Sequence, residues 1–344
     1  MNFEEGNYKN IHYGDILIKF PTLVDSKTTL IPFINKNIVI TPKMNLLKDG
    51  DIVIADTAED YTAGKAIELV VREDNILSGL HTIPCRPKFK FSSGYLGYYL
   101  NSQSFRKNLL PLIQGIKVYS VSKYMFKLLY INYPSLEEQQ KVSELLFKVD
   151  QQIDTQNKII EELKLLKKSV NYDIFHDLSN FDLLENVCDI CTGKLDANKY
   201  NENGLYPFFT CGRETLSINE YAFDCEAILI AGNGDMGTSK YYKGKFNAYQ
   251  RTYVLFNFKD EAMFLKNAID YYLPTKIASE SQSSAMSYIK IDTLKKLKIP
   301  VIDNASKEKI ININKLLDAK LANEEAILKN YLLQKSYFLN NLFI

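Results

Sequence analysis

The chain has 344 residues, of which 46% are apolar and 24% charged, and its formal net charge is +1. This length leaves room for two domains of ordinary size, and no apolar run approaches the ~18 residues of a membrane span. The start, MNFEEGNYKN, is acidic and polar, which is not typical of a signal peptide. Five mostly scattered cysteines argue against a disulfide scaffold, so we expect a cytoplasmic protein.

Residues 1–133 predict a first unit of mixed α/β structure. Residues 15–20 alternate as in a half-buried strand, and Ile52–Ala55 follow a turn as a buried strand. Residues 75–136 contain no Asp or Glu, and basic residues are interleaved there with aromatic ones. Such a face is typical of a nucleic-acid surface. The alternative is a soluble domain whose acidic residues happen to lie elsewhere.

Residues 134–176 predict one long helix. Pro134 precedes it, and Ser135 with Glu138 matches a capping box. Apolar residues then recur in alternating steps of three and four, which is the seam of a coiled coil. The seam residues are Val142, Leu146, Val149, Ile153, Ile160 and Leu163. Polar residues interrupt the pattern at Gln156 and Lys167.

The same pattern returns 168 positions later, so that Val142 corresponds to Ile310 and the two interruptions to Glu324 and Lys335. Two unrelated helices would rarely share their interruptions, and we therefore interpret the chain as a tandem duplication of a globular unit followed by a helix. The second unit covers residues 177–300 and the second helix residues 301–344. The second seam consists of Ile310, Leu317, Leu321, Leu328 and Tyr331. Mutual pairing of the helices is favoured over a hairpin that only stabilises one domain.

The second unit also concentrates positive charge and tyrosine, because residues 236–259 contain no Asp or Glu. Its first residues, 183–194, have no counterpart before Tyr8 in the first unit. Two explanations stay open: the first unit is shortened at its start, or the true start of the protein lies upstream of Met1.

Two short motifs could indicate chemistry. Residues 232–237 read GNGDMG after a predicted strand, as in a dinucleotide or S-adenosylmethionine loop, but the residues that follow predict no helix. A glycine-rich turn is favoured. Cys188 and Cys191 have the spacing of a zinc or redox pair, but the second unit contains no histidine to complete a zinc site. We expect no metal site.

The junction before the first helix resembles a known family. Residues 131–142 read INYPSLEEQQKV, which is similar to the I-P-x-P-x-x-x-E-Q-x-x-I junction in specificity (S) subunits of type I restriction–modification systems. The continuations LLFKVD at 145–150 and LLD at 316–318 also resemble that family, whereas the second junction, residues 299–304, lacks the Glu-Gln pair. The resemblance implies an α+β fold with two mixed α/β target-recognition domains, each followed by a long helix. The two helices would pair as an antiparallel coiled coil.

The resemblance further implies a non-catalytic subunit that reads a bipartite target in double-stranded DNA. Two modification subunits would bring S-adenosylmethionine and methylate adenine, and restriction subunits would add ATP- and Mg-dependent cleavage. No cofactor is expected in this chain. Two other classes stay open: a methyltransferase that uses the GNGDMG loop, and a coiled-coil scaffold without DNA binding.

Local charge and loop position select the candidate DNA contacts, since base edges and phosphates are read by Arg, Lys, Gln and similar side chains. In the first unit the candidates are Arg86, Lys88, Lys90, Gln114 and Lys117. In the second unit they are Arg213, Lys240, Tyr241, Lys243, Lys245, Arg251 and Gln282.

Overall fold

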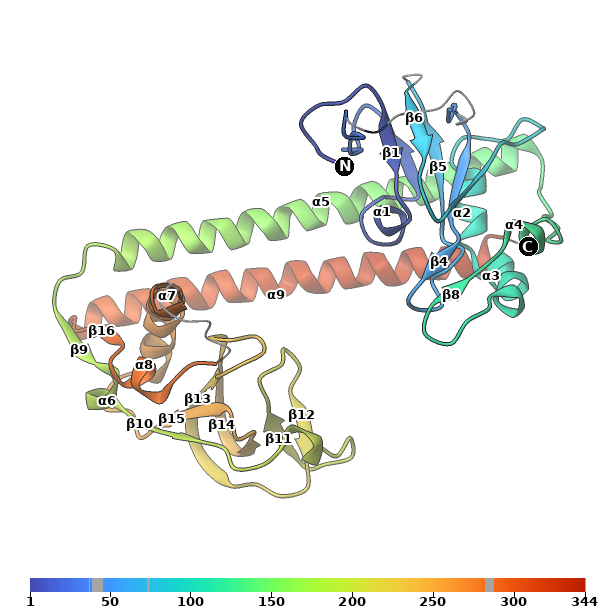
Figure 1. Ribbon diagram of the computed structural model, residues 1–344. Coiled ribbons are helices and arrows are strands. Elements are labelled where there is room, and N and C mark those ends of the chain that lie inside the picture. Colours follow the sequence, from blue (N-terminus) through green and yellow to red (C-terminus); the bar gives the residue numbers. More distant parts are fainter. Residues whose placement is uncertain (37, 39–45, 73–74, 282–287, 344) are drawn as a thin grey trace. The chain divides into compact units, whose positions relative to one another are not determined.

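The structure is a computed structural model that describes residues 1–36, 38, 46–72, 75–281 and 288–343 (Figure 1). The chain forms two compact units. Unit 1 comprises Met1–Ile159 with Glu324–Ile344, and unit 2 comprises Ile160–Asn323. Helices α5 (Leu136–Phe175) and α9 (Asn304–Asn341) contribute to both units. Over the described ranges, no helix has the length and apolar character needed to span a membrane.

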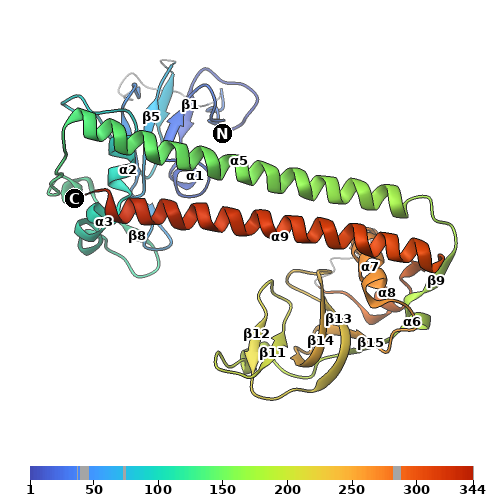
Figure 2. The same ribbon diagram turned by 180° about the vertical axis from the view of Figure 1, so that it is seen from behind.

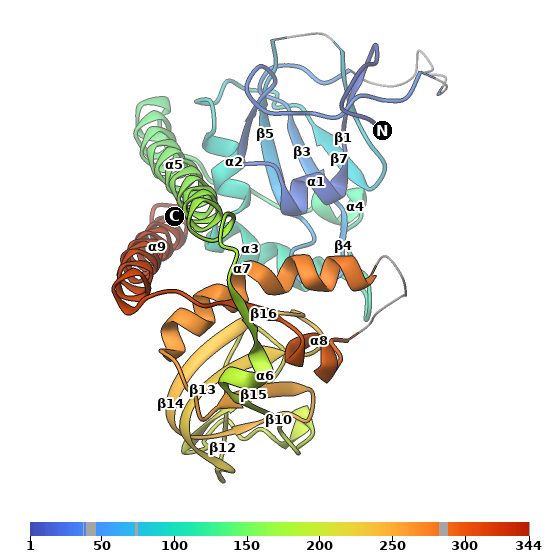
Figure 3. The ribbon, with the colours of Figure 1, turned by 90° about the vertical axis from the view of Figure 1, so that its left-hand side faces the viewer.

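Unit 1 is built on a four-stranded sheet in the order β2-β5-β3-β7. The strands are β2 (Leu23–Asp25), β3 (Ile52–Ala55), β5 (Ala66–Val70) and β7 (Thr82–Cys85). The central strand β3 is buried on both faces: Ile52 and Ile54 belong to one apolar cluster, and Val53 and Ala55 to another. The predicted buried strand is therefore confirmed, and its continuous apolar run reflects the two cores. Figure 3 shows β5, β3 and β7 in this order.

The remaining elements of unit 1 are short. Strand β1 (Lys9–Ile11) pairs in parallel with β6 (Ile76–Ser78), and β4 (Thr57–Ala58) pairs with β8 (Tyr119–Ser120). The helices are α1 (Tyr13–Ile18), α2 (Tyr95–Leu100), α3 (Gln103–Leu109), the 3-10 turn Leu110–Leu112 and α4 (Lys123–Phe126).

The strand expected at residues 15–20 is wrong, because helix α1 includes residues 15–18 and ends at Ile18. His12 caps the helix by accepting a hydrogen bond from the backbone N–H of Gly14 at 3.2 Å. Ile16 and Phe20 are both buried and stand four residues apart, which is helical spacing. Lys19 forms an ion pair with Asp15 one turn earlier. The apolar-polar alternation was too short to distinguish a helix from a strand.

Unit 2 contains a six-stranded sheet in the order β10-β15-β13-β14-β11-β12. The strands are β10 (Asp189–Thr192), β11 (Tyr206–Phe209), β12 (Leu216–Ile218), β13 (Phe223–Ala231), β14 (Ser239–Ala248) and β15 (Thr252–Phe256). Strand β9 (Phe181–Leu183) pairs with β16 (Lys298–Pro300). The helices are α6 (Leu184–Val187), the 3-10 turn Ala197–Lys199, α7 (Ala262–Ser281) and α8 (Ile291–Lys295).

The two faces of the unit 2 sheet have separate cores. Ile228 and Ile230 of β13 pack with Phe264 and Leu273 of α7, whereas Leu229, between them, packs on the opposite face. This alternation follows from the period of two along a strand. The strand predicted directly before residue 232 is thereby confirmed as the last part of β13.

Within unit 1, the first part of α5 lies beside the last part of α9 (Figure 2). Lys335 pairs with Asp150 at 2.6 Å, and the Gln156 amide donates to the Glu324 backbone carbonyl at 3.1 Å and also to its carboxylate. Along these contacts the residue numbers of α9 fall as those of α5 rise, so the two helices are antiparallel. The predicted interruptions Gln156 and Glu324 thus meet each other, and both are buried.

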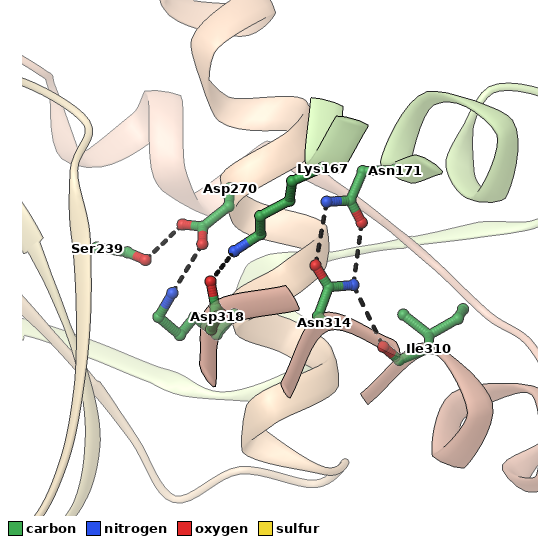
Figure 4. A network of polar contacts seen from close by, with 8 residues as sticks. Lys167, Asn171, Ser239, Asp270, Ile310, Asn314 and Asp318 are labelled. Carbon is green, nitrogen blue, oxygen red and sulfur yellow. Dashed lines mark hydrogen bonds and ion pairs between the residues drawn. The ribbon is translucent and has the colours of Figure 1, made fainter. Parts of the chain in front are cut away.

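Within unit 2, the last part of α5 lies beside the first part of α9, as Figure 4 shows. Lys167 pairs with Asp318, and the side-chain amides of Asn171 and Asn314 exchange two hydrogen bonds of 3.0 Å each. Lys167 and Asp318 stand 168 positions from Lys335 and Asp150, so the duplication repeats this ion pair. The antiparallel coiled coil is confirmed, and the predicted seam residues are buried or half-buried: Val142, Leu146, Val149, Ile153, Ile160, Leu163, Ile310, Leu317, Leu321, Leu328 and Tyr331.

Candidate nucleic-acid interface

The first candidate loop of unit 1 follows strand β7 and carries Arg86, Lys88 and Lys90. All three residues are exposed, but the Arg86 guanidinium is already engaged. Its Nε and Nη2 donate to the two carboxylate oxygens of the buried Asp51, each at 2.7 Å. The hydrogen bonds to Asp51 raise the pKa of Arg86. Lys88 and Lys90 are therefore the cations of this loop that are more available to a phosphate.

The other unit 1 candidates lie at the far end of the sheet. Gln114 and Ser120 exchange two backbone hydrogen bonds, at 2.9 and 2.8 Å, which close a hairpin with Lys117 near its tip. Strand β8 in this hairpin pairs with β4, beyond the Ala55 end of β3, whereas Cys85 pairs with Ile52 at the opposite end. At ~3.3 Å per residue, the span from residue 52 to residue 58 separates the two groups by about 20 Å. The unit 1 candidates thus form two clusters.

In unit 2, three of the candidate cations gather around the GNGDMG loop. This loop joins the antiparallel strands β13 and β14, so the predicted glycine-rich turn is confirmed. Asp235 of the loop donates its N–H to the Cys211 carbonyl at 3.1 Å, and its carboxylate lies 3.6 Å from the Arg213 Nε. Gly232 donates to the Arg251 carbonyl at 2.9 Å. A Cβ at Gly232 would lie 2.3 Å from that same oxygen, so close backbone packing requires glycine there.

Lys240 has a structural role beside this loop. Its ammonium donates to the backbone carbonyls of Gly212 and Arg213, at 3.1 and 2.6 Å, and so holds the loop that presents Arg213. Burial lowers the pKa of Lys240. The Arg213 side chain itself is 91% exposed. We therefore regard Arg213 as the better candidate for direct contact and Lys240 as its support.

Tyr241, Lys243 and Lys245 alternate along β14 and so share one face of that strand. The Tyr241 hydroxyl donates to the Glu226 carboxylate at 2.5 Å, and this hydrogen bond raises the pKa of Tyr241 to about 12. The Lys245 ammonium lies 4.7 Å from the ring centroid of Tyr221. Lys243 and Lys245 are exposed, and they stand opposite Glu226 and Asp224 of β13. The two lysines are the cations of the β14 row that a phosphate backbone could contact.

Arg251 lies 5.5 Å from the ring centroid of Tyr288, and Lys245 also has an aromatic partner in Tyr221. Sequence reasoning missed both tyrosines because their proximity to the cations depends on the fold. Gln282 lies outside the described residues. Among the described residues, no group of three or more His, Cys, Asp and Glu is placed to hold a metal ion. The arrangement thus offers cations, amides and aromatic faces.

A family model described as "Type I restriction modification DNA specificity domain" matches residues 5–165 and 180–331. The chain belongs to this family. The two matches follow the two halves of the duplication, and each specificity domain therefore contains one globular sheet and most of the helix that follows it.

Two curated relatives are similar in sequence to parts of this chain. The specificity subunit of the type I restriction enzyme EcoDI from Escherichia coli is 43% identical over 111 residues, which is 31% of this chain and 24% of the relative. The putative MjaX specificity subunit from Methanocaldococcus jannaschii is 28% identical over 128 residues, or 37% of this chain and 30% of the relative. The matched parts are thus less than a third of either relative's length.

Solved structures support the fold. The type I restriction–modification S subunit from M. genitalium is similar with a TM-score of 0.59 and 17% identity, covering 99% of this chain and 89% of that chain. A chain from a study of complex assembly and conformational transition of the type I R-M system is similar with a TM-score of 0.58 and 17% identity. The match covers 88% of this chain and 84% of that chain. At this identity the likeness concerns the fold alone.

Proposed function

We propose that this protein is the DNA sequence-recognition subunit of a type I restriction–modification complex, without catalytic activity of its own. The observation that supports the proposal is the pair of specificity-domain matches, each on its own half of the duplication. Each half carries a basic and aromatic surface of different composition, which suits two readers of different sequences. Each specificity domain would bind one half of a bipartite target in duplex DNA.

Partner subunits would supply the chemistry. The relatives are specificity subunits, and we infer that modification subunits would bind this chain, bring S-adenosylmethionine and methylate adenine within the recognised site. Restriction subunits would bring ATP and Mg for cleavage. The GNGDMG loop favours this division of labour over a methyltransferase in this chain, because it joins two antiparallel strands and opens no helix that could bind a phosphate.

The paired helices would set the distance between the half-sites. Helices α5 and α9 contain 40 and 38 residues, and at 1.5 Å per residue each is about 60 Å long. Deleting one heptad from each helix should shorten the preferred spacer between the half-sites. An unchanged spacer would refute this part of the proposal.

Reversing the charge of the β14 row tests DNA binding. The double variant Lys243→Glu/Lys245→Glu should weaken duplex retention and reduce the slope of log affinity against log salt by about two, since each phosphate contact contributes ~0.9. Lys309→Glu/Lys315→Glu, at exposed positions of α9 in the same unit, is the matched control. If both variants and the wild type retain duplex DNA equally, this face does not contact DNA. The measurement should use the chain with its modification subunits.

A further inference from the structure

Three loops of unit 2 are joined to one another by hydrogen bonds, and we call them the loop cluster. They are residues 210–215 after β11, residues 232–238 between β13 and β14, and residues 249–251 between β14 and β15. Asp235 donates its N–H to the Cys211 carbonyl, and Gly232 donates to the Arg251 carbonyl. The Cys211 thiol donates to the same Arg251 carbonyl at 3.3 Å. Each loop is thus bonded to both of the others.

Close packing fixes the cluster further. Gly234 has a φ of +61°, and a Cβ at this position would lie 3.0 Å from the Cys211 carbonyl oxygen. The Lys240 ammonium, which holds two carbonyls of the first loop, also lies 3.4 Å from the Thr215 hydroxyl. A loop held at several points presents its side chains in one place. Reading a base requires such fixed donors and acceptors, whereas a contact to phosphate serves mainly to position the duplex.

Asn233 carries an unused amide in this cluster. The residue is half-buried, and its side chain forms no hydrogen bond with another residue in the described part of the chain. A side-chain amide offers one donor and one acceptor side by side. This pair matches N6 and N7 of adenine in the major groove. Sequence reasoning passes over Asn233, because Asn followed by Gly is first of all a turn signal.

Arg213 presents the complementary chemistry on the adjoining loop. Its Nε lies 3.6 Å from the Asp235 carboxylate, and its two terminal amino groups have no partner among the described residues. The parallel N–H groups of a guanidinium match O6 and N7 of guanine. Asn233 stands two residues from Asp235, a span of at most ~7 Å. The two side chains can therefore reach bases within about three base pairs of each other, at ~3.4 Å per pair.

Charge favours the loop cluster over the neighbouring loops as the part that meets DNA. The cluster carries two Arg against one Asp and one Glu, and the Asp is already engaged by Arg213. The loops at residues 201–205 and 219–222 carry two Glu and neither Lys nor Arg. Because duplex DNA is a polyanion, it approaches the cluster at a lower electrostatic cost.

We propose that the loop cluster is the base-reading part of unit 2. Asn233 determines the choice of adenine, and Arg213 the choice of guanine, at two nearby positions of one half-site. Lys243 and Lys245 would contact phosphates, which position the duplex without reading it. This inference rests on the proposed function, because it takes duplex DNA as the ligand of unit 2.

The test has two stages, both with the full chain and its modification subunits. Mapping of methylated adenines first gives the wild-type motif. Duplexes with single-base substitutions in that motif then compete for binding to the wild type and to each variant. Asn233→Gly removes the amide and keeps the backbone freedom of the turn. The wild type should prefer adenine at one position by about 10- to 100-fold, and Asn233→Gly should reduce this preference to about threefold or less.

Two further variants separate base reading from a structural role. Asn233→Asp keeps only acceptors, so it should favour cytosine over adenine at the same position, since a carboxylate accepts from N4 of cytosine. Arg213→Ala should relax the choice of guanine within about three base pairs, in the same half-site. Asn203→Ala is the matched control, because Asn203 is exposed and lies in the loop before β11; it should leave every preference unchanged.

The outcomes distinguish the inference from the proposed function. If the wild type directs no methylation to a bipartite motif, the proposed function fails and the inference fails with it. If the wild type does so and both Asn233 variants keep its preferences, only the inference fails. Uniform weakening of all duplexes by both Asn233 variants would make Asn233 a turn residue without a reading role. Changes by Asn233→Gly and Arg213→Ala in different half-sites would also overturn the shared cluster.

Discussion

The buried amide pair Asn171–Asn314 offers a sharp test of the helix pairing. The Asn314 side chain is 2% exposed, exchanges two hydrogen bonds with Asn171 at 3.0 Å, and donates to the Ile310 carbonyl at 3.2 Å. The duplication supplies a natural comparison. The counterparts of this pair, 168 positions away, are Leu339 and Leu146, which pack in one apolar cluster of unit 1.

Replacing one member of the pair should destabilise the protein, whereas replacing both should leave its stability nearly unchanged. Asn314→Leu removes three hydrogen bonds and leaves the half-buried Asn171 amide without its partner, which should lower the free energy of unfolding by ~2–3 kcal/mol. Asn171→Leu should cost a similar amount. The double variant places leucine against leucine, as in unit 1, and should be about as stable as the wild type because burial of a leucine contributes ~1.5–3 kcal/mol.

Urea unfolding followed by far-UV circular dichroism measures this cycle. Asn312→Leu, at an exposed position on the same helix, is the control and should change stability by less than ~0.5 kcal/mol. If the double variant loses the sum of the two single losses, the two side chains do not meet. The antiparallel register would then be wrong.

Three further predictions concern single positions. Leu146→Ala should cost ~2–5 kcal/mol in urea unfolding because Leu146 is 0% exposed, whereas Leu145→Ala, at 38% exposure, should cost far less. Glu68→Gln should lower the free energy of unfolding by ~1–3 kcal/mol, measured by thermal unfolding. The Glu68 carboxylate accepts hydrogen bonds from the N–H groups of Gly94 and Gly97 at 2.6 and 2.9 Å, and the single oxygen of an amide can replace only one of these bonds. Equal melting temperatures would show that these bonds contribute nothing. Hydrogen bonds from Ser306 lower the pKa of Asp303 below its usual 3.8, so the cap that Asp303 forms on α9 should be fully present above that pH and lost as the pH falls through the lowered pKa. An acid titration of helicity should show this loss, and Asp303→Asn should remove it.

The long helices were predictable because their information is local. The capping box forms as expected: Ser135 donates its N–H to the Glu138 carboxylate at 3.2 Å, and Glu138 returns its own N–H to the Ser135 hydroxyl at 3.4 Å. The seam follows from a repeat of apolar residues that lies entirely within about forty consecutive residues. The shared interruptions at Gln156 and Glu324 were also visible in the sequence, although that they bond to each other was not.

The sheets were less predictable because strand order depends on long-range pairing. In unit 1, the next strand of the four-stranded sheet after β3 is β5, which lies between β3 and β2. In unit 2, the next strand after β13 is β14, which lies on the side of β13 that faces away from β10. The two halves therefore match in their long helices but connect their sheets differently. No local pattern in the chain distinguishes these alternatives.

The candidate contacts show the same limit. Composition identified the basic stretches, but it could not reveal that Arg86 is engaged by the buried Asp51 or that Lys240 supports the Arg213 loop. Arg86 and Asp51 are 35 positions apart, and Lys240 reaches carbonyls 27 and 28 positions away. Burial and pairing of this kind depend on tertiary structure, and they separate side chains that support a loop from those free to reach a ligand.

Mapping methylated adenines by single-molecule sequencing would show whether this chain directs methylation to a bipartite DNA target. The chain would be expressed with a modification subunit of its system in cells that otherwise lack adenine methylation. If each specificity domain binds one half-site, the methylated sites should share one motif made of two short half-sites separated by an unspecified spacer of fixed length. A single uninterrupted motif, or no methylation that depends on this chain, would contradict it.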